Sequence, residues 1–268
     1  IITGGMESMS RVPMDGDSYQ ELHPELGEQY NIFQLQMGMT AEKVAEEYGV
    51  SREEQDEYAA RSQQRAVEAT ESGRFDDEIL PIETEDGVVE EDEGLRPGTT
   101  AEKLSGLPPA FTGDGTVTAG NSSQISDGAS LVMVTSEAFA EENDLDIVAE
   151  IGTNEVVGVD PTVMGIGPVP ATKGLLERAG TDIDDYDLVE LNEAFASQCV
   201  YAREELGIPA DNFNVNGGAI AIGHPLGASG ARLPVTLLHE MEKRGDSRGL
   251  ATLCVGFGQG AAIEFLME

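Results

Sequence analysis

The stretch Asn216-Gly-Gly-Ala-Ile-Ala-Ile-Gly-His224-Pro-Leu-Gly-Ala-Ser-Gly230 places one histidine between a glycine and a proline, in a segment that contains five glycines. Glycine permits positive φ angles and close backbone approach, whereas proline fixes φ and removes a backbone donor. This composition favours a rigid loop that holds the imidazole of His224 and leaves room beside it for a ligand. The plainer interpretation is a glycine-rich loop whose histidine only completes a local hydrogen bond.

Two other polar motifs accompany this histidine: Asn192-Glu-Ala-Phe-Ala196 and Cys254-Val-Gly-Phe-Gly-Gln-Gly260. Asn192, His224 and Cys254 each lie at or just after the end of an expected strand. In open α/β sheets, functional groups gather where strands end. We therefore expect the three side chains to form a catalytic set. The plainer alternatives are a strand-end turn for the asparagine and an inert buried thiol for the cysteine.

The three motifs, in this order and at this spacing, resemble those of the thiolase family. Weaker matches extend the resemblance over nearly the whole chain, at residues 4–9, 37–42, 51–56, 115–121, 158–161 and 164–168. The resemblance implies an α/β, thiolase-like fold with a mixed sheet layered with helices, incomplete at its N-terminus. It also implies a loop domain with the remnant of the N-terminal half (1–125), the last strand and helix of that half (126–147) and a C-terminal domain (148–268).

The activity that the resemblance implies is acyl transfer by an acetyl-CoA C-acetyltransferase or C-acyltransferase of fatty acid metabolism. Such an enzyme cleaves 3-ketoacyl-CoA with coenzyme A, or condenses two acyl-CoA molecules, through an acyl-cysteine. Cys254 matches the acid/base, while His224 matches the donor to the enolate oxygen. Asn192 matches the residue that fixes a water in the same oxyanion hole, and Gly256 provides an N–H for a second hole. The alternative is a non-catalytic acyl-CoA-binding or scaffold subunit of the same fold, against which the intact Asn–His–Cys set argues.

The nucleophilic cysteine of the family matches neither cysteine of this chain. Cys199 falls on an expected helix, and Cys254 matches the family's second, C-terminal cysteine. We therefore expect a fragment that lacks roughly 100 residues before Ile1, about one small domain. We expect this fragment to be inactive by itself.

The resemblance also suggests which side chains line the coenzyme A and acyl sites. These are Ser123 and Phe111 on pantetheine, Arg96 near the adenine phosphates, and Met37, Met164 and Phe195 in the acyl pocket. The substrates are coenzyme A thioesters, and no metal or other cofactor is expected. A core position for Phe195, gap-filling by the methionines and a surface charge for Arg96 are the plainer interpretations.

Two positions depart from the family pattern. Phe257 stands where the family's Cys-x-Gly-Gly-Gly has its second glycine, which adds bulk beside Cys254. Gln36 stands where the family commonly has histidine. The first change predicts a narrower or reshaped acyl pocket, and the second removes one supporting hydrogen bond.

The chain carries 51 acidic and 15 basic residues, a net charge of −36. Such a charge repels nucleic acid and anionic membrane surfaces, so neither is an expected partner. The excess is spread along the chain, which favours a salt-adapted protein of a high-salt cytoplasm. Two cysteines give no disulfide framework, and no hydrophobic run reaches transmembrane length. From the family we expect a homo-oligomer, a dimer or tetramer, and an accessory subunit as a further partner.

Periodicity and end signals predict the secondary structure. Thr40 is expected to cap a helix over 41–47, and Ser51 with Glu54 forms a capping box for a helix that ends near Gly73. The acidic stretch 83–93 reads as a solvated hairpin or loop. From residue 126 we expect strands over 129–135 (buried), 147–156 and 188–191, a short strand at Val215, a hairpin of 249–255 and 261–267, and helices over 136–143, 171–179, 193–206 and 229–244.

Overall fold

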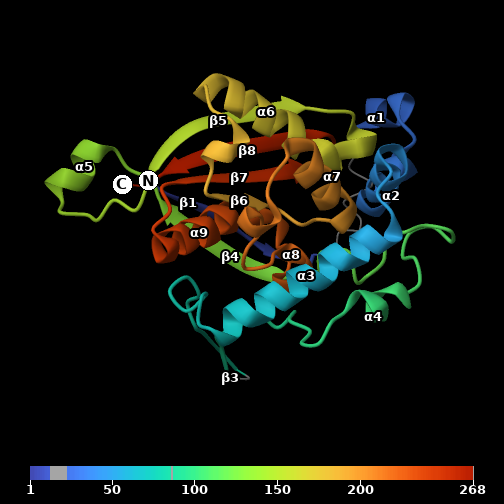
Figure 1. Cartoon of the computed structure of the whole chain (residues 1–268), viewed down its shortest axis with the longest axis horizontal. Coiled ribbons are helices and arrows are strands. Elements are labelled where there is room, and N and C mark those ends of the chain that lie inside the picture. The colour runs from blue at the N-terminus through green and yellow to red at the C-terminus, as the bar shows by residue number, and fades with distance from the viewer. Residues whose placement is uncertain (13–22, 86, 268) are drawn as a thin grey trace.

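A computed structural model describes residues 1–12, 23–85 and 87–267. Its centre is a four-stranded sheet in the order β5-β8-β7-β6 (Figure 1). The strands are β5 (Glu150–Gly158), β6 (Leu188–Leu191), β7 (Arg248–Val255) and β8 (Gln259–Leu266). β6 runs parallel to β7, while β7–β8 and β8–β5 are antiparallel. The expected mixed sheet is therefore confirmed, as is its closing hairpin.

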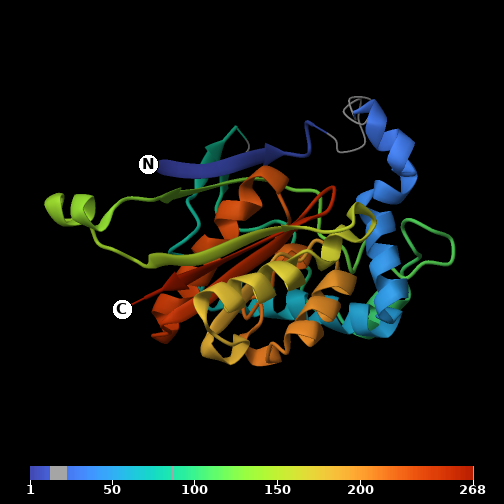
Figure 2. The same cartoon turned by 90° about the horizontal axis from the view of Figure 1, so that it is seen from above.

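Helices cover both faces of this sheet. α9 (Leu226–Arg244) packs on β6 and β7, and its other side contacts a two-stranded ribbon of β1 (Ile2–Ser8) and β4 (Asp127–Met133). α6 (Pro168–Ala179) covers β5 and β8 on the opposite face, beside α7 (Ala196–Leu206). Figure 2 shows the resulting layers in profile, with the ribbon on the far side of α9 from α6 and α7.

The prediction of a buried strand near residues 129–135 is wrong in its burial. β4 alternates between exposed and half-buried positions, and Leu131 and Met133 on its outer face are 67% and 56% exposed. Met6 of β1 is exposed in the same way. The reason is that a two-stranded ribbon packed on one helix has a single covered face, whereas the continuous apolar run resembles that of a strand covered on both sides.

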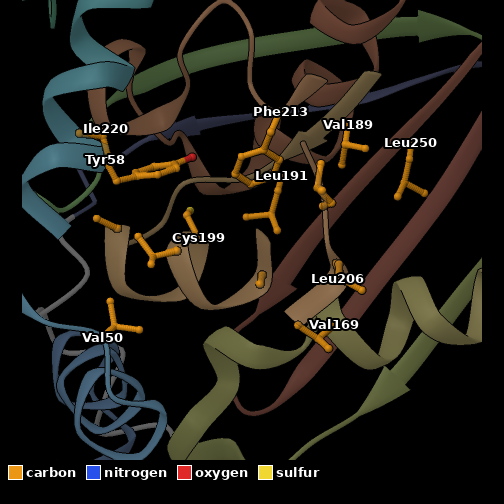
Figure 3. Packing of buried hydrophobic residues seen from close by; sticks show 14 of the residues in the cluster. Val50, Tyr58, Val169, Val189, Leu191, Cys199, Leu206, Phe213, Ile220 and Leu250 are labelled. Carbon is orange, nitrogen blue, oxygen red and sulfur yellow. The ribbon is translucent and has the colours of Figure 1, made fainter. Parts of the chain in front are cut away.

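The largest hydrophobic core lies between the sheet and α3 (Arg52–Glu71), α6 and α7. Figure 3 shows the side chains from α3, β6 and α7 pointing toward one another around Phe213, with Cys199 among them. Phe213 is fully buried. Burying one such side chain contributes about 1.5–3 kcal/mol relative to leaving it in water. This core fixes the ends of β6 and α7, where the polar motifs begin.

The helix that follows Ser51 has the predicted ends. Ser51 accepts from the Glu54 amide, and the Glu54 carboxylate accepts from the Ser51 amide, so the capping box is present. Gly73 follows in a left-handed conformation, with φ of 72°. One face of the helix is buried, at Tyr58, Ala59, Ser62, Ala66 and Ala69, which recur at helical spacing.

Several other predicted elements differ from the structure, among them α6, which starts at Pro168 instead of residue 171, and β5, which starts at Glu150 instead of residue 147. α2 (Met37–Tyr48) starts before Thr40, whose hydroxyl bonds back to the Met37 carbonyl instead of capping the helix. α9 starts at Leu226, because Pro225 occupies its N-cap. Val215 lies in a turn, and the isolated bridge to β6 is made by Phe213.

The remaining elements are short or close to their expected places. The acidic stretch forms an exposed hairpin of β2 and β3, and Asp86 lies outside the described residues. The remaining helices and strands of the described residues are α1 (Pro24–Gln29), η2 (Ile32–Leu35), β2 (Ile82–Thr84), β3 (Gly87–Val89), α4 (Ala101–Ser105), α5 (Glu137–Glu142), η3 (Pro161–Ile166), η4 (Ile183–Asp185), η5 (Ala210–Asn212) and α8 (Ala219–Ile222).

Candidate active site

Asn192 follows directly after β6, and the next three residues are not helical, with a bend at Ala194. The prediction of a helix from residue 193 is therefore wrong, since α7 begins at Ala196 with Phe195 as its N-cap. Phe195 forms an isolated bridge with Ser122, and the Ala196 amide donates to the Asn121 carbonyl. These contacts with a distant loop compete with the helical hydrogen bonds that the local sequence would make.

Glu193 ties together the segments on either side of Asn192. Its fully buried carboxylate accepts four hydrogen bonds, from the hydroxyls of Tyr58 (2.8 Å) and Ser62 (2.6 Å), the Asn214 amide group (3.0 Å) and the Ile220 backbone N–H (3.1 Å). The donors come from α3, from the turn after Phe213 and from α8. Glu193 therefore fixes the end of β6 against the loop that carries His224.

His224 lies between α8 and α9, at the end of a turn that requires glycine. Gly223 has φ of 95°, and a Cβ there would lie 2.1 Å from the Ser126 hydroxyl. The imidazole makes two side-chain contacts: Nδ1 lies 2.6 Å from the Ser229 hydroxyl, and Nε2 lies 3.1 Å from Nδ2 of Asn192. Two of the three motif residues are thus in direct contact.

Burial keeps His224 uncharged. It lowers the pKa of the imidazole to about 4, and the positive charge of Arg232 acts in the same direction. At neutral pH the ring is therefore neutral and carries one proton, on either nitrogen. Beside it, Oδ1 of Asn192 is buried without a hydrogen-bond partner in the described part of the chain. A buried orphan acceptor of this kind marks a place for a water or ligand donor.

Cys254 is the second-to-last residue of β7 and is 7% exposed. Burial raises the pKa of its thiol to about 11. The thiol lies 3.0 Å from Oε1 of Gln198, whose Nε2 donates to the Asn192 carbonyl at 3.0 Å. One amide of α7 therefore connects the backbone of Asn192 with the sulfur of Cys254. All three motif residues belong to one contiguous site.

Three of the expected acyl-pocket side chains surround Cys254. Met164 and Phe195 pack with it in one apolar cluster, and Met37 contacts this cluster from the start of α2. A Cβ at Gly256 would lie 3.7 Å from the Met37 methyl group, so the turn after Cys254 also borders the cluster. These residues come from segments far apart in the sequence and form one wall of the site.

Phe111 also borders this wall. Its ring meets that of Phe195 edge to face at 6.1 Å between centroids, and it is 44% exposed. Gly38 makes this approach possible, because a Cβ there would lie 2.2 Å from the Phe111 ring. A half-exposed aromatic ring beside a buried apolar cluster is suited to an apolar part of a ligand.

Ser123 and Arg96 lie in different surroundings. The Ser123 amide donates to the Ala194 carbonyl, so this half-buried serine is next to the motif that follows Asn192. Arg96 lines a separate cavity of about 240 Å³ along α3, which includes Gln64 and Glu68 but none of the three motif residues. The structure therefore does not bring Arg96 together with the Asn–His–Cys set.

The two departures from the family pattern have clear local structures. Phe257 adopts φ of 66° in the β7–β8 turn, a conformation that side chains with a Cβ rarely take, and it is 45% exposed. Gln36 is the N-cap of α2 but makes no side-chain capping bond.

Sequence reasoning missed two residues of this site, Gln198 and Ser229. Both are polar, buried and located in the first turn of a helix that follows a motif. A polar side chain in the first turn of a helix that directly follows a motif is the signal that could have found them. Among the described residues, no cluster of three or more histidine, cysteine or acidic side chains is arranged to hold a metal ion. No helix in the described ranges is both long and apolar enough to span a membrane.

Comparisons with known proteins agree with this geometry. The N-terminal domain of thiolase matches residues 1–138, and the C-terminal domain of thiolase matches residues 145–266. The chain is 50% identical to a 3-ketoacyl-CoA thiolase of Bacillus subtilis and 49% identical to an acetyl-CoA acetyltransferase of Pseudomonas aeruginosa. Each match covers 98% of this chain and 71% of the relative.

Solved structures show the same relationship. The chain superposes on human mitochondrial 3-ketoacyl-CoA thiolase with a TM-score of 0.89 and 42% identity, covering all of this chain and 71% of the human one. The same human enzyme in complex with CoA gives a TM-score of 0.90, with 70% of that chain covered. For the acetyl-CoA acetyltransferase of Bacillus anthracis the TM-score is 0.83 at 47% identity, over 87% of this chain and 60% of that one. The chain belongs to the thiolase family.

Proposed function

We propose that this chain carries the acid–base and oxyanion-binding groups of a thiolase, which cleaves 3-ketoacyl-CoA with coenzyme A or condenses two acyl-CoA molecules. The observation that supports this most is the contact of Asn192 with both His224 and, through Gln198, Cys254. Relatives that match 98% of the chain bear both names, 3-ketoacyl-CoA thiolase and acetyl-CoA acetyltransferase. Both reactions form or break the same carbon–carbon bond.

Cys254 is proposed as the acid/base. In condensation its thiolate removes the α-proton of one acyl-CoA, and the resulting carbanion attacks the carbonyl of an acyl-cysteine, whose sulfur leaves. In cleavage the thiol returns the proton to the enolate as the carbon–carbon bond breaks. Burial raises the pKa of Cys254 to about 11, so the resting group is the acid form that cleavage requires.

His224 is proposed as the donor to the thioester oxygen that becomes negative. For this role Nε2 must carry the proton, so Nδ1 must accept from the Ser229 hydroxyl, which lies 2.6 Å away. The same hydroxyl also lies 3.0 Å from the Pro225 carbonyl, so its proton has two acceptors within reach, this carbonyl and Nδ1 of His224. We propose that substrate binding selects the bond to Nδ1. Asn192 is then free to hold a water beside the imidazole. Removing one such donor typically lowers the rate by about 10²–10³.

Coenzyme A thioesters are the proposed substrates, with the acyl chain against Met37, Met164 and Phe195 and the pantetheine near Ser123 and Phe111. The apolar cluster around Cys254 and the half-exposed Phe111 ring support this orientation. A human relative was solved in complex with CoA. Arg96 is the weaker proposal for the phosphate end of coenzyme A, since the cavity that it lines lies apart from Asn192, His224 and Cys254.

The acyl-accepting thiol is proposed to be neither cysteine of this chain. Cys199 is fully buried in the core, where desolvation raises its pKa well above the ordinary value, and both features prevent attack on a thioester. Cys254 is needed for proton transfer. Peptide mapping after incubation of the active protein with acetoacetyl-CoA should therefore find no acyl group on either residue. An acyl group on Cys254 would refute its acid/base assignment.

The decisive test separates acyl transfer from carbon–carbon chemistry. Exchange of labelled CoA into acetyl-CoA requires no α-proton transfer, whereas condensation does. In the active protein, Cys254→Ala should lower condensation by more than about 10³ while leaving exchange within about tenfold. Ser105→Ala, an exposed helix residue, is the matched control. Unchanged condensation in Cys254→Ala would refute the acid/base assignment, whereas absence of both reactions before any substitution would favour the acyl-CoA-binding or scaffold alternative.

We also propose that the protein works in a high-salt cytoplasm. The support is the net charge of −36, together with the ion pairs that already engage ten of the basic side chains. The remaining acidic surface is screened only by dissolved counterions. At 1 M salt the Debye length is about 3 Å, which makes neighbouring carboxylates nearly independent.

A further inference from the structure

Gln198 lies in the first turn of α7, where its side chain connects the two halves of the site. It is 1% exposed. Its Nε2 donates to the Asn192 carbonyl at 3.0 Å, and its Oε1 lies 3.0 Å from the sulfur of Cys254. Both bonds lie within the buried part of the site.

The orientation of this amide follows from the Asn192 carbonyl. A backbone carbonyl only accepts hydrogen bonds, and this one also accepts from the Ala194 amide. If the amide of Gln198 were reversed, two oxygens would face each other and the sulfur would meet an N–H. The nitrogen of Gln198 must therefore face Asn192, and its oxygen must face Cys254.

This orientation determines the state of the sulfur. An amide oxygen accepts a hydrogen bond from a thiol but repels a thiolate, which has no proton to donate. Burial of the sulfur acts in the same direction, because it raises the pKa of the Cys254 thiol. The amide oxygen of Gln198 and the burial of the sulfur therefore both favour the thiol.

We propose that Gln198 is a positioning residue that holds the proton of Cys254 and fixes the sulfur in the orientation for proton transfer. In condensation Cys254 takes the α-proton and becomes a thiol. Oε1 of Gln198 then accepts a hydrogen bond from this thiol and stabilises the protonated form of Cys254. In cleavage it presents a preformed acid. The meaning for catalysis rests on the proposed function, whereas the state of the thiol follows from the contacts alone.

The first test needs no variant. The Raman S–H stretching bands of the native protein report whether each thiol donates a hydrogen bond, and a Cys199→Ala variant assigns them. We expect the Cys254 band at the lowered frequency of a thiol bonded to a carbonyl oxygen. Absence of a Cys254 S–H band, or a band at the frequency of a free thiol, would overturn the proposal.

The second test uses Gln198→Met, which keeps the shape of the side chain and removes the acceptor. The Cys254 band should move to higher frequency, and the pKa of the thiol should fall by about one unit. Iodoacetamide modification of Cys254 at pH 8 should then be about threefold faster, since the larger thiolate fraction outweighs the lower nucleophilicity. A slower reaction would mean that Gln198 stabilises the thiolate, and the proposal would fail.

Ser197→Ala is the matched control, because Ser197 also lies in the first turn of α7 and its hydroxyl donates only to the Ala41 carbonyl. It should leave the Cys254 band and alkylation rate unchanged. An equal change in both variants would show that loosening α7 is sufficient, which contradicts a specific role for Gln198. In an active protein, Gln198→Met should lower kcat with KM unchanged. If a protein that includes the acyl-accepting cysteine shows no thiolase activity while the thiol responds as expected, the proposed function fails and the inference on Gln198 stands.

Discussion

The Glu193→Gln substitution tests whether one carboxylate fixes the site loop to the end of β6. Each oxygen of Glu193 accepts one hydrogen bond from a hydroxyl and one from an N–H group. The hydroxyls of Tyr58 and Ser62 can reverse direction. The N–H groups of Asn214 and Ile220 cannot, so whichever oxygen becomes an NH₂ group will face a donor.

The magnitude follows from this count. The variant loses at least one hydrogen bond to a charged acceptor and gains one buried donor–donor contact. A hydrogen bond to a charged group contributes about 1.5–3 kcal/mol, and leaving a buried donor unpaired costs about 1–3 kcal/mol, so we expect the free energy of unfolding to fall by about 2–4 kcal/mol. Native proteins are stable by only about 5–15 kcal/mol, so such a loss is easily measured.

Urea titration at high salt measures the free energy of unfolding, and hydrogen exchange at the Ile220 amide reports the local effect. Exchange at this amide should accelerate more than exchange in the sheet, because its acceptor is lost. Glu57→Gln is the control: Glu57 is exposed on α3, so this variant removes the same charge from an acidic protein without touching the network. Surface substitutions usually change the free energy of unfolding by at most about 0.5 kcal/mol. If the free energies of unfolding of Glu193→Gln and Glu57→Gln differ by less than about this amount, the described network does not hold the loop.

Three further outcomes are expected. Burial raises the pKa of Glu190 to about 8, and the charge of Arg232 only partly offsets it. The contribution of Glu190 to the free energy of unfolding is therefore fully present below about pH 4.3 and is lost as the pH rises towards 8. Glu190→Gln should accordingly raise the free energy of unfolding by about 3 kcal/mol at pH 7 but hardly at pH 4, as measured by urea titration. Phe257→Gly should stabilise by about 1 kcal/mol in the same assay, because glycine relieves the positive φ; a loss would show that the ring packs more than its exposure suggests. Dialysis from molar salt to about 0.1 M should abolish the circular dichroism of the fold, and full retention would refute salt adaptation.

The α/β pattern and most of the helices could be predicted because their signals are local. The capping box at Ser51 and the left-handed glycines after α3, α7 and α9 act within a few residues. β6 also matches its predicted range, since a short apolar run between turn signals has few alternatives. The start of α7 could not be predicted, because the bridge between Phe195 and Ser122 depends on a loop some seventy residues earlier in the chain.

The exposure of β4 illustrates a different limit. An apolar run predicts a strand, but only the tertiary arrangement determines whether one face or both are covered. In this chain β4 pairs with β1 and packs on α9, so Leu131 points away from the helix and is exposed.

The sequence could predict that the three motif residues lie together, but not which of their atoms carry protons. The Asn192, His224 and Cys254 motifs identify the family, and the structure brings these residues into one site. Which atoms carry protons depends on Gln198 and Ser229, whose contacts with the motif residues exist only after β6, α7 and α9 have packed. Resemblance indicates which groups are proposed to react, while the hydrogen-bond partners that set their protonation must be found in the packed structure. The acid/base behaviour proposed for Cys254 therefore depends on the start of α7 as much as on its own motif.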